Sequence, residues 1–443
     1  MLREGILSAL QSAIRSLQQK IDSAQPEQTQ AVVQLSPFKE NSLIDWLEAQ
    51  PIFPKFYWQS RDGRDEVVAL GQLKTFMDPS AAKSVLAKGQ RIWGGRSFDG
   101  RTARNRRCLS SFFFLPQLEL SRCNDRWQLV ANLSADNTDV QETLSTLSDN
   151  VTPLAGLQCR VLSQVHEPDF SGWSSMVNGA LDAISQRVFD KVVLARKTTL
   201  KLSRPLSSAQ FLKASRQSNS HSFHFMMALD EKHCFIGSTP ERLYVRNGSD
   251  IHTEALAGTI GRGESIAEDN KLASWLINDE KNRYENRLVV DDIVSRLDPQ
   301  CSILDIAQEP ELVKLRKVQH LKRAISGHLS SGSNDISLLD SLQPTAAIAG
   351  LPREPALNFI ADNEPFSRGW YSGAMGFLGD ERSEFCVAIR SALVMDDELH
   401  LFAGAGIVPG SQAHSEWQEL DRKMSTLLTL IEPEEVLSAQ KLA

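Results

Sequence analysis

Hydrophobic and polar residues follow different periods in different parts of the chain. Between Ile6 and Ile21 the apolar residues recur at helical spacing and are interrupted by charges, which predicts an amphipathic helix packed on the rest of the fold. Residues 22–36 are mostly polar and predict a connector. From about residue 50 to residue 145, short β-rich runs alternate with turn-forming residues, and this pattern predicts antiparallel strands.

After about residue 170 strands alternate with longer helical patterns. The tetrapeptide NGSD, which begins at Asn247, is interpreted as a hairpin turn between two strands. The predicted helices span 171–188, 268–297 and about 411–431. The predicted strands cover 191–202, 220–229, 234–238, 242–245, 251–256, 370–379, 385–394 and 399–408.

Mixed, mostly antiparallel sheets with helices on their outer faces predict an α+β fold of the two-layer α/β type. No repeat of fixed period is present. Residues 1–160 are expected to form a β-rich N-terminal portion with a leading helix, packed as part of the same fold. Residues 161–435 are expected to form the catalytic region.

Charge and composition narrow the function. The chain has 443 residues, a formal net charge of −7 and a pI of about 5.8, so no overall basic field favours nucleic acid or anionic lipid. The leading helix is too polar to cross a membrane and lacks the apolar core of a signal peptide. Six scattered cysteines without a CxxC pair fit a reducing cytoplasm. The arginine-rich segment 96–107 is interpreted as an exposed loop that aids solubility.

Acidic residues on two predicted helices are the first chemical candidates. Glu416, Glu419 and Lys423 share one face of the closing helix, beside its apolar stripe. Glu285 lies on the helix over 268–297, one turn after Lys281. Exposed i,i+4 ion pairs would explain both patterns. If a carboxylate from each helix met across a groove, the two could instead hold Mg²⁺, which takes one or two protein carboxylates.

Three further charged residues occupy unusual places. Lys191 shares a strand face with small apolar residues, and a lysine acts as a general base only where burial or nearby positive charge lowers its pKa. Glu241 follows the turn GSTP at a strand junction. Arg390 is expected on a strand face of small residues, with room for a bidentate carboxylate. Simpler explanations are a strand-end lysine in solvent, a glutamate paired with a nearby base, and a paired arginine.

Two glycine-rich passages follow strands, at 254–263 and 404–411. The second, GAGIVPGS, suggests a dinucleotide-binding loop at a helix N-terminus. Its spacing is GxGxxxG rather than GxGxxG, and too few residues follow it for a second strand with a ribose-binding acid. A dinucleotide-binding module therefore remains only an alternative, although the glycine amides could still bind a carboxylate.

Nine motifs in a fixed order resemble the chorismate-utilising enzymes, which include isochorismate, anthranilate, aminodeoxychorismate and salicylate synthases. The resemblance covers about residues 165–430, and the stretch IDWLEAQPIFPKFYWQSRDG is similar to isochorismate synthases of menaquinone biosynthesis. The motifs are KVVLAR, GSTPERL, TEALAGT, the KxxxE helix, KVQHL, QPTAAIAGLP, CVAIRSA, FAGAGIV and EWQELDRK.

The resemblance implies roles for five of the charged residues. Glu285 and Glu419 match the family's magnesium ligands, with Glu416 in support. Lys191 matches the base that activates water, and Glu241 matches the acid that faces the leaving C4 hydroxyl. These roles imply a Mg²⁺-dependent conversion of chorismate to isochorismate, an isomerase reaction.

The resemblance also implies substrate contacts. Arg390 and Tyr371 match groups that hold the enolpyruvyl carboxylate. Relatives often have a histidine where this chain has Asn286, a position not expected to bind metal. The remaining matched positions are Gly404 and Gly406 beside the enolpyruvyl carboxylate, Gly258 and Thr259 near the ring carboxylate, and His320 and Lys423 elsewhere in the site.

Two related activities stay open at this stage. A salicylate synthase would use the same lysine, acid and magnesium and then eliminate pyruvate. An isochorismate synthase could also serve siderophore rather than menaquinone biosynthesis. The sequence does not determine the oligomeric state or whether the arginine-rich segment contacts a partner.

Overall fold

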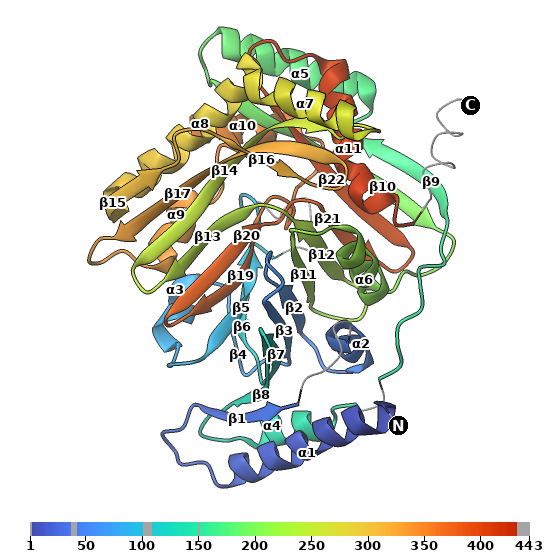
Figure 1. The fold of residues 1–443 in the computed structure, drawn as a ribbon, viewed down its shortest axis with the longest axis vertical. Coiled ribbons are helices and arrows are strands. Elements are labelled where there is room, and N and C mark those ends of the chain that lie inside the picture. The colour runs from blue at the N-terminus through green and yellow to red at the C-terminus, as the bar shows by residue number, and fades with distance from the viewer. Residues whose placement is uncertain (1, 37–41, 101–108, 149–150, 432–443) are drawn as a thin grey trace.

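Two large antiparallel β-sheets face each other in the computed structural model (Figure 1). Every strand pairing in the described part of the chain is antiparallel, and helices cover the outer faces, as the α+β prediction required. Residues 101–107 of the arginine-rich segment lie outside the described residues. The structure describes residues 2–36, 42–100, 109–148 and 151–431.

The first sheet has twelve strands and contains parts of both halves of the chain. In spatial order its strands are β1 (Gln30–Leu35), β8 (Arg126–Asn132), β7 (Leu118–Cys123), β3 (Asp65–Leu70), β2 (Lys55–Gln59), β11 (Phe223–Ala228), β12 (Cys234–Thr239), β21 (Ser391–Met395), β22 (Glu398–Ile407), β10 (Lys191–Leu202) and β18 (Gly350–Leu351), with β9 (Val161–Glu167) also paired to β10.

The second sheet has ten strands. In spatial order they are β15 (Cys301–Ile306), β17 (Val318–Leu329), β14 (Asp250–Gly261), β13 (Arg242–Asn247), β20 (Arg382–Val387), β19 (Ala374–Gly379), β5 (Arg91–Arg96), β6 (Ser111–Leu115) and β4 (Lys74–Phe76), with β16 (Glu311–Lys314) also paired to β17. The predicted NGSD hairpin joins β13 to β14, where Asn247 pairs with Asp250.

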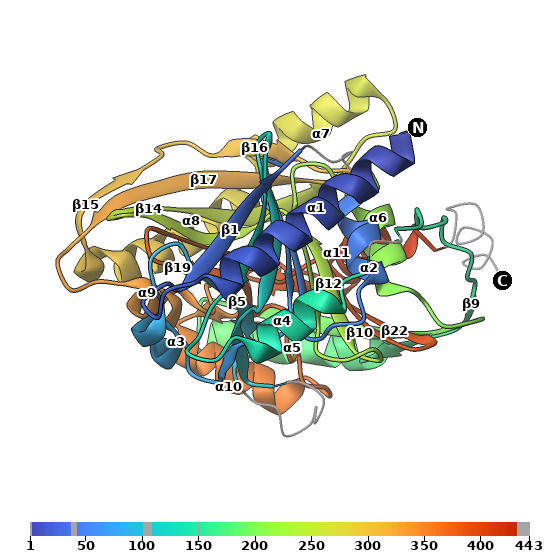
Figure 2. The ribbon, with the colours of Figure 1, turned by 90° about the horizontal axis from the view of Figure 1, so that it is seen from below.

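Helices pack on the outside of both sheets (Figure 1). The first sheet is covered by α1 (Leu2–Asp22), α2 (Ser42–Ala49), α4 (Thr138–Ser145), α5 (Phe170–Ser185), α6 (Ser208–Ser218), α10 (Arg353–Asn363) and α11 (Ala413–Leu428). The second is covered by α3 (Pro79–Val85), α7 (Ile266–Asn278), α8 (Glu280–Leu297) and α9 (Asp335–Leu342). The predicted leading helix is α1, which lies beside β1 in both views (Figure 1, Figure 2).

The space between the sheets is filled by aromatic side chains. Trp58 on β2 stacks near Phe223 on β11, with ring centroids 5.2 Å apart, and Trp93 on β5 lies 4.9 Å from Phe377 on β19. Along β11 alternate residues face this aromatic core and the outer helices, so all six residues are buried. A strand buried on both faces does not alternate between apolar and polar residues, and β11 is apolar except for His224, whose ring is hydrogen-bonded to Ser238.

Strands of the two predicted regions are interleaved. In the first sheet β2 pairs with β11, and in the second β5 pairs with β19. Residues 1–160 and residues 161–435 thus contribute to both sheets, and the division at residue 160 stays a prediction.

The structure corrects three predicted elements. The polar connector over 22–36 contains strand β1, whose residues pair with β8. The helix predicted over 268–297 is two helices, because Asp279 is extended and its side chain accepts a hydrogen bond from the backbone N–H of Asn282, which starts α8. The strand predicted over 385–394 is interrupted after Val387, where the chain passes from the second sheet to the first.

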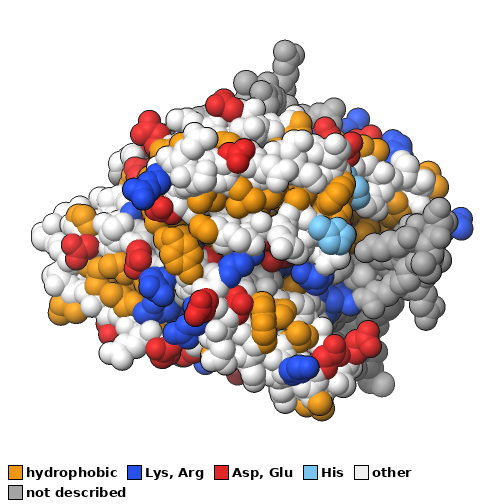
Figure 3. All heavy atoms as spheres, turned by 90° about the horizontal axis from the view of Figure 1, so that it is seen from above, with side chains coloured by type: hydrophobic (Ala, Val, Ile, Leu, Met, Phe, Trp, Pro, Cys, Tyr) orange, Lys and Arg blue, Asp and Glu red, His pale blue; other side chains and the backbone are white. Residues whose placement is uncertain are grey.

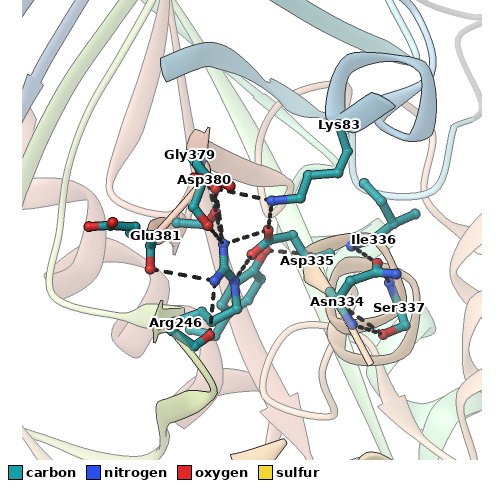
Figure 4. A network of polar contacts seen from close by, with 12 residues as sticks. Lys83, Arg246, Asn334, Asp335, Ile336, Ser337, Gly379, Asp380 and Glu381 are labelled. Carbon is teal, nitrogen blue, oxygen red and sulfur yellow. Dashed lines mark hydrogen bonds and ion pairs between the residues drawn. The ribbon is translucent and has the colours of Figure 1, made fainter. Parts of the chain in front are cut away.

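A buried charge network fixes three elements around the second sheet (Figure 4). The Arg246 guanidinium on β13 donates to both carboxylate oxygens of Asp335, over 2.7 and 2.9 Å. Lys83 on α3 reaches the same carboxylate over 3.1 Å. Asn334 caps α9 in a capping box with Ser337. Because Arg246 also donates to backbone carbonyls, including that of Gly379, the buried charges are satisfied without solvent.

The helical face at the top of Figure 1 carries mixed side chains (Figure 3). Hydrophobic groups lie among acidic and basic ones there. The larger exposed apolar side chains on these helices include Phe170 on α5 and Ile266 and Trp275 on α7. None of the helices in the described residues is both long and apolar enough to span a bilayer.

Candidate active site

Two crossings of the chain between the sheets form one side of a pocket. Glu241 lies in the crossing from β12 to β13, and Arg390 lies in the crossing from β20 to β21. Each crossing accepts a hydrogen bond from a strand that leads into the other crossing. Ser238 N–H on β12 donates to the Arg390 carbonyl over 3.0 Å, and Val387 N–H on β20 donates to the Glu241 carbonyl over 3.1 Å. Both charged side chains are thereby fixed at the junction of the two sheets.

The pocket holds about 630 Å³ of space not occupied by protein atoms, its open mouth included. Ten of the thirteen predicted site residues line it. Of the other three, Lys191 and Glu419 form ion pairs with lining residues, and Glu416 pairs with Lys281. The ten are Glu241, Gly258, Thr259, Glu285, His320, Tyr371, Arg390, Gly404, Gly406 and Lys423.

Lys191 is the first residue of β10 and its side chain is fully buried. Its Nζ lies 3.0 Å from Oε1 of Glu285 on α8 and directs no hydrogen bond to another protein group among the described residues. Burial opposes ionisation of Glu285, but the charges of Lys191, Lys423 and Lys281 together outweigh it and lower the pKa of that carboxyl. The expectation of a solvated strand-end lysine is therefore wrong.

Glu241 is 4% exposed. Burial, together with the nearby charge of Glu254, raises the pKa of its carboxyl to about 8, although Lys191, Lys423 and Arg390 act in the opposite direction. A glutamic acid that keeps its proton at neutral pH can donate that proton to a leaving group. This residue thus has the properties of a general acid.

Arg390 does not lie on a strand face, which corrects the prediction. It directly precedes β21 with a backbone φ of +50°, a left-handed conformation, and its side chain contacts α11 and β17. Nη1 donates to the Lys423 carbonyl over 3.0 Å, and Nη2 lies 3.3 Å from Nε2 of His320. Burial lowers the pKa of Arg390 to about 10, so the guanidinium remains charged at neutral pH.

His320 connects Arg390 to the glycine-rich passage of β14. Burial, reinforced by the charges of Arg390 and Lys423, lowers the pKa of His320 well below its usual value, so the ring is neutral. Because Nε2 faces the guanidinium, Nδ1 carries the proton and donates to Thr259 Oγ1 over 2.9 Å. Gly258 has a φ of +84°, and a Cβ there would crowd Asn282.

Asn286, which stands where relatives often have histidine, lies away from the pocket. It is 2% exposed, and its Nδ2 lies within hydrogen-bond distance of three backbone carbonyls of β14 and β17. It fastens α8 to the second sheet one residue after Glu285, consistent with the expectation that it does not bind metal.

Gly404 and Gly406 on β22 have no side chain, and polar groups of other predicted site residues occupy the space beside them. A Cβ at Gly404 would lie 2.9 Å from the Tyr371 hydroxyl, and a Cβ at Gly406 would lie 2.3 Å from Oε1 of Glu285 and 3.0 Å from Cε of Lys191. Tyr371 is buried and stacks on Phe402. The glycines of GAGIVPG therefore allow the Tyr371, Glu285 and Lys191 side chains to approach the backbone of β22 closely. The passage does not begin a βαβ unit.

The acidic face of α11 points toward α8. Lys281 does not pair with Glu285, as the i,i+4 alternative proposed, but donates to Oε1 of Glu416 over 2.8 Å. Glu419 does form the i,i+4 pair with Lys423, over 2.7 Å, but both side chains are only 17% exposed. Lys423 also donates to the Gly404 carbonyl over 2.8 Å. The Glu419–Lys423 pair is therefore mostly shielded from solvent, and Lys281, the more exposed partner of the other pair, covers a buried Glu416.

The carboxylates of α8 and α11 are oxygen ligands of the kind that a hard cation takes. Glu285, Glu416 and Glu419 are paired with Lys191, Lys281 and Lys423 in turn. All three carboxylates also lie within the electrostatic reach of Lys281 and raise its pKa. Burial and the neighbouring charge of Glu419 raise the pKa of Glu416, a repulsion that a cation would relieve. No group of three or more acidic, histidine or cysteine side chains in the described residues is arranged to hold a metal by itself. Mg²⁺ needs only one or two, with water and substrate oxygens completing its shell.

Sequence reasoning missed a buried pair that supports the pocket wall. The Glu364 carboxylate accepts from the Ala195 N–H over 2.8 Å, and Arg368 donates to the Val193 carbonyl over 2.7 Å. Arg368 also donates to the Ile348 carbonyl over 2.8 Å. The two side chains thus form hydrogen bonds with backbone groups of β10 in the segment that pairs with neither β18 nor β9. Their i,i+4 spacing in NEPFSRGW was the available signal.

Known proteins resemble this chain over nearly its whole length. The chorismate binding enzyme family matches residues 15–432. Isochorismate synthase MenF of Escherichia coli K12 is 39% identical, over 97% of this chain and 100% of the relative. MenF of Haemophilus influenzae is 36% identical, over 98% and 99%. The solved structure of the menaquinone-specific isochorismate synthase MenF from Escherichia coli superimposes with a TM-score of 0.87, at 38% identity, covering 96% of this chain and all of that one.

Proposed function

The chain belongs to the chorismate-binding enzymes, and from this we propose that it is an isochorismate synthase that converts chorismate to isochorismate for menaquinone biosynthesis. The reaction adds water at C2 of the ring and loses the hydroxyl at C4, with a shift of the ring double bonds. The observation that carries this proposal is a carboxyl with a raised pKa in the pocket, Glu241, and a buried amine within its electrostatic reach, Lys191.

Lys191 is assigned the role of base. It would accept a proton from the water that attacks C2. A buried amine can accept a proton only when it is not held charged by a counter-ion, so the Glu285 carboxylate, 3.0 Å away, has to be engaged elsewhere during the reaction. The full burial of the Lys191 side chain keeps bulk water from competing as a proton source.

Glu241 is assigned the role of acid. It would deliver its proton to the C4 hydroxyl as that group leaves as water. Its burial supplies the protonated form at neutral pH, because the pKa of the carboxyl is about 8. Acid and base at one ring require opposite environments, and here one group comes from a crossing between sheets and the other from the start of a strand.

The anionic groups of chorismate match the positive side of the pocket. Arg390 and Tyr371 are assigned to the enolpyruvyl carboxylate, with the backbone at Gly404 and Gly406 beside them. Arg390 is buried and charged, so a carboxylate is the partner that best offsets its lost hydration. The His320 ring keeps the guanidinium oriented from the opposite side.

Glu285 and Glu419 would hold Mg²⁺, with Glu416 in support. The chemistry that a bound Mg²⁺ supplies at this place is neutralisation and orientation of the substrate's ring carboxylate. Gly258 and Thr259 line the adjoining wall, where their backbone leaves space for that carboxylate.

The test is incubation of the purified protein with chorismate, with and without Mg²⁺, followed by identification of products. Isochorismate formed only with Mg²⁺ is the expected result. Salicylate together with pyruvate would instead assign a salicylate synthase, and the absence of conversion would overturn the proposal. We place the reaction in the cytoplasm, since the five described cysteines are all free thiols.

A further inference from the structure

Arg61 and Glu254 form a largely buried ion pair next to the pocket, between the first sheet and the second. Arg61 lies in the turn between β2 and β3, and its Nη2 donates to Oε2 of Glu254 on β14 over 3.0 Å, while Nη1 contacts Oε1. The Glu254 side chain is 5% exposed and that of Arg61 is 22% exposed. The pair joins the N-terminal hairpin to the strand that carries the TEALAGT motif.

The same pair is bonded to both chain neighbours of Glu241. Nη1 of Arg61 donates to the Pro240 carbonyl over 2.7 Å. The Arg242 N–H donates to Oε1 of Glu254 over 3.1 Å. The peptide groups on each side of Glu241 are thus attached to one charged unit, while the Glu241 carbonyl accepts from Val387.

We propose that Arg61 and Glu254 are positioning residues for the reaction, which fix the backbone around Glu241 and keep a negative charge beside its carboxyl. This inference rests on the proposed role of Glu241 as the acid. It gives the N-terminal hairpin a function in the chemistry, although neither side chain lines the pocket.

The charges that face Glu241 come from four elements. Glu254 on β14 is negative, whereas Lys191 on β10, Lys423 on α11 and Arg390 after β20 are positive. The buried thiol of Cys386 on β20 also lies within the electrostatic reach of Glu241. The three cations favour loss of the Glu241 proton, and Glu254 opposes them. Removing the charge of Glu254 should therefore make Glu241 a stronger acid.

The test compares Glu254→Gln with Arg61→Met. In Glu254→Gln the alkaline limb of the kcat profile should move to lower pH, on the order of one unit, because the opposing charge is gone. In Arg61→Met it should move to higher pH, because Glu254 loses its counter-charge. Arg61→Lys restores the charge without the bidentate contact, so its limb should return to the wild-type position while kcat stays reduced.

Arg382→Met is the matched control. Arg382 also ties β3 to the second sheet, through Asp65 and Glu384, but contacts neither Pro240 nor Glu254. The alkaline limb of the kcat profile of Arg382→Met should stay at the wild-type pH. Shifts of the same sign in Glu254→Gln and Arg61→Met, or none in either, would overturn the proposal and leave the pair a structural one.

A readout independent of turnover separates this inference from the proposed function. The Glu241 carboxyl can be titrated by NMR in protein with ¹³C-labelled glutamate, and assigned from the signal missing in Glu241→Gln. Its midpoint should fall in Glu254→Gln whether or not chorismate is the substrate. An unchanged midpoint in an enzyme that makes isochorismate would reject the positioning pair alone.

Discussion

Lys191 and Glu285 form an ion pair across the two layers of the fold, with Nζ and Oε1 3.0 Å apart. Lys191 begins a strand of the first sheet, and Glu285 lies on a helix that covers the second. The proposed base and a proposed metal ligand therefore share one contact, so any group that engages Glu285 also changes the charge environment of Lys191.

Substitution of Lys191 should remove turnover without unfolding the protein. Lys191→Met keeps the length of the side chain but cannot accept a proton, and we expect kcat to fall at least about 1000-fold, near the upper part of the range for a general base. Lys201→Met is the control, because Lys201 lies near the other end of β10 and is 45% exposed. Circular dichroism and product analysis measure both effects. Near-normal turnover in Lys191→Met would disprove its role.

Glu241→Gln should be inactive yet more stable than the wild type as pH rises. Between its ordinary pKa of 4.5 and about 8, the folded protein retains a proton that the unfolded chain releases. The free energy of unfolding of the wild type therefore falls across this window. Glutamine removes that dependence, and the difference should reach the order of a few kcal/mol at pH 8. Urea unfolding at several pH values measures it, and parallel pH curves for the two proteins would contradict the raised pKa.

Loss of a carboxylate at the helix pair should weaken Mg²⁺ binding. We expect Glu285→Gln and Glu419→Gln to raise the Mg²⁺ dissociation constant at least about tenfold, because a hard cation loses a charged oxygen ligand. Calorimetric titration in the presence of chorismate measures this directly. Glu309→Gln, an exposed glutamate paired with Arg283, is the control. Equal Mg²⁺ affinity in all variants and the wild type would remove these residues from the metal site.

Gly406→Ala should separate the Lys191–Glu285 pair. The new Cβ would lie 2.3 Å from Oε1 of Glu285, so the carboxylate has to move. We expect kcat to fall at least tenfold with a loss of stability of about 1–3 kcal/mol from overpacking. Gly156→Ala is the control, since a Cβ there has nothing within 4 Å. Wild-type kinetics in Gly406→Ala would show that the close approach is not needed.

Periodic elements of the fold could be predicted from the sequence, and changes of direction could not. Strand β10 matches its predicted bounds because its buried first half and alternating second half contain no turn residue or helical period. The crossing at Arg390 was missed because the residues on either side of it are small or apolar and hydrophobic alternation continues through it. The break between α7 and α8 had a local signal in the capping aspartate, Asp279, which the helical periodicity concealed.

The site residues were found through motifs, but their pairings were not. Local spacing suggested that Lys281 would pair with Glu285, whereas it reaches Glu416 on another helix. An i,i+4 contact contributes only a few tenths of a kcal/mol, so tertiary packing readily replaces it. Glu254 belongs to the motif TEALAGT, but nothing in the sequence indicated its pairing with Arg61, which lies in a distant hairpin.

The pairing of β10 with β22 has a consequence for how the chain reaches its native state during synthesis. Val192 pairs with Ile407, near the end of the described chain, and β2 pairs with β11 from the other half. Contacts this distant in sequence close large loops and form slowly. On the ribosome β10 keeps an open hydrogen-bonding edge until β22 emerges, and such edges favour association with other chains. The strand that carries Lys191 is thus among the last to be completed.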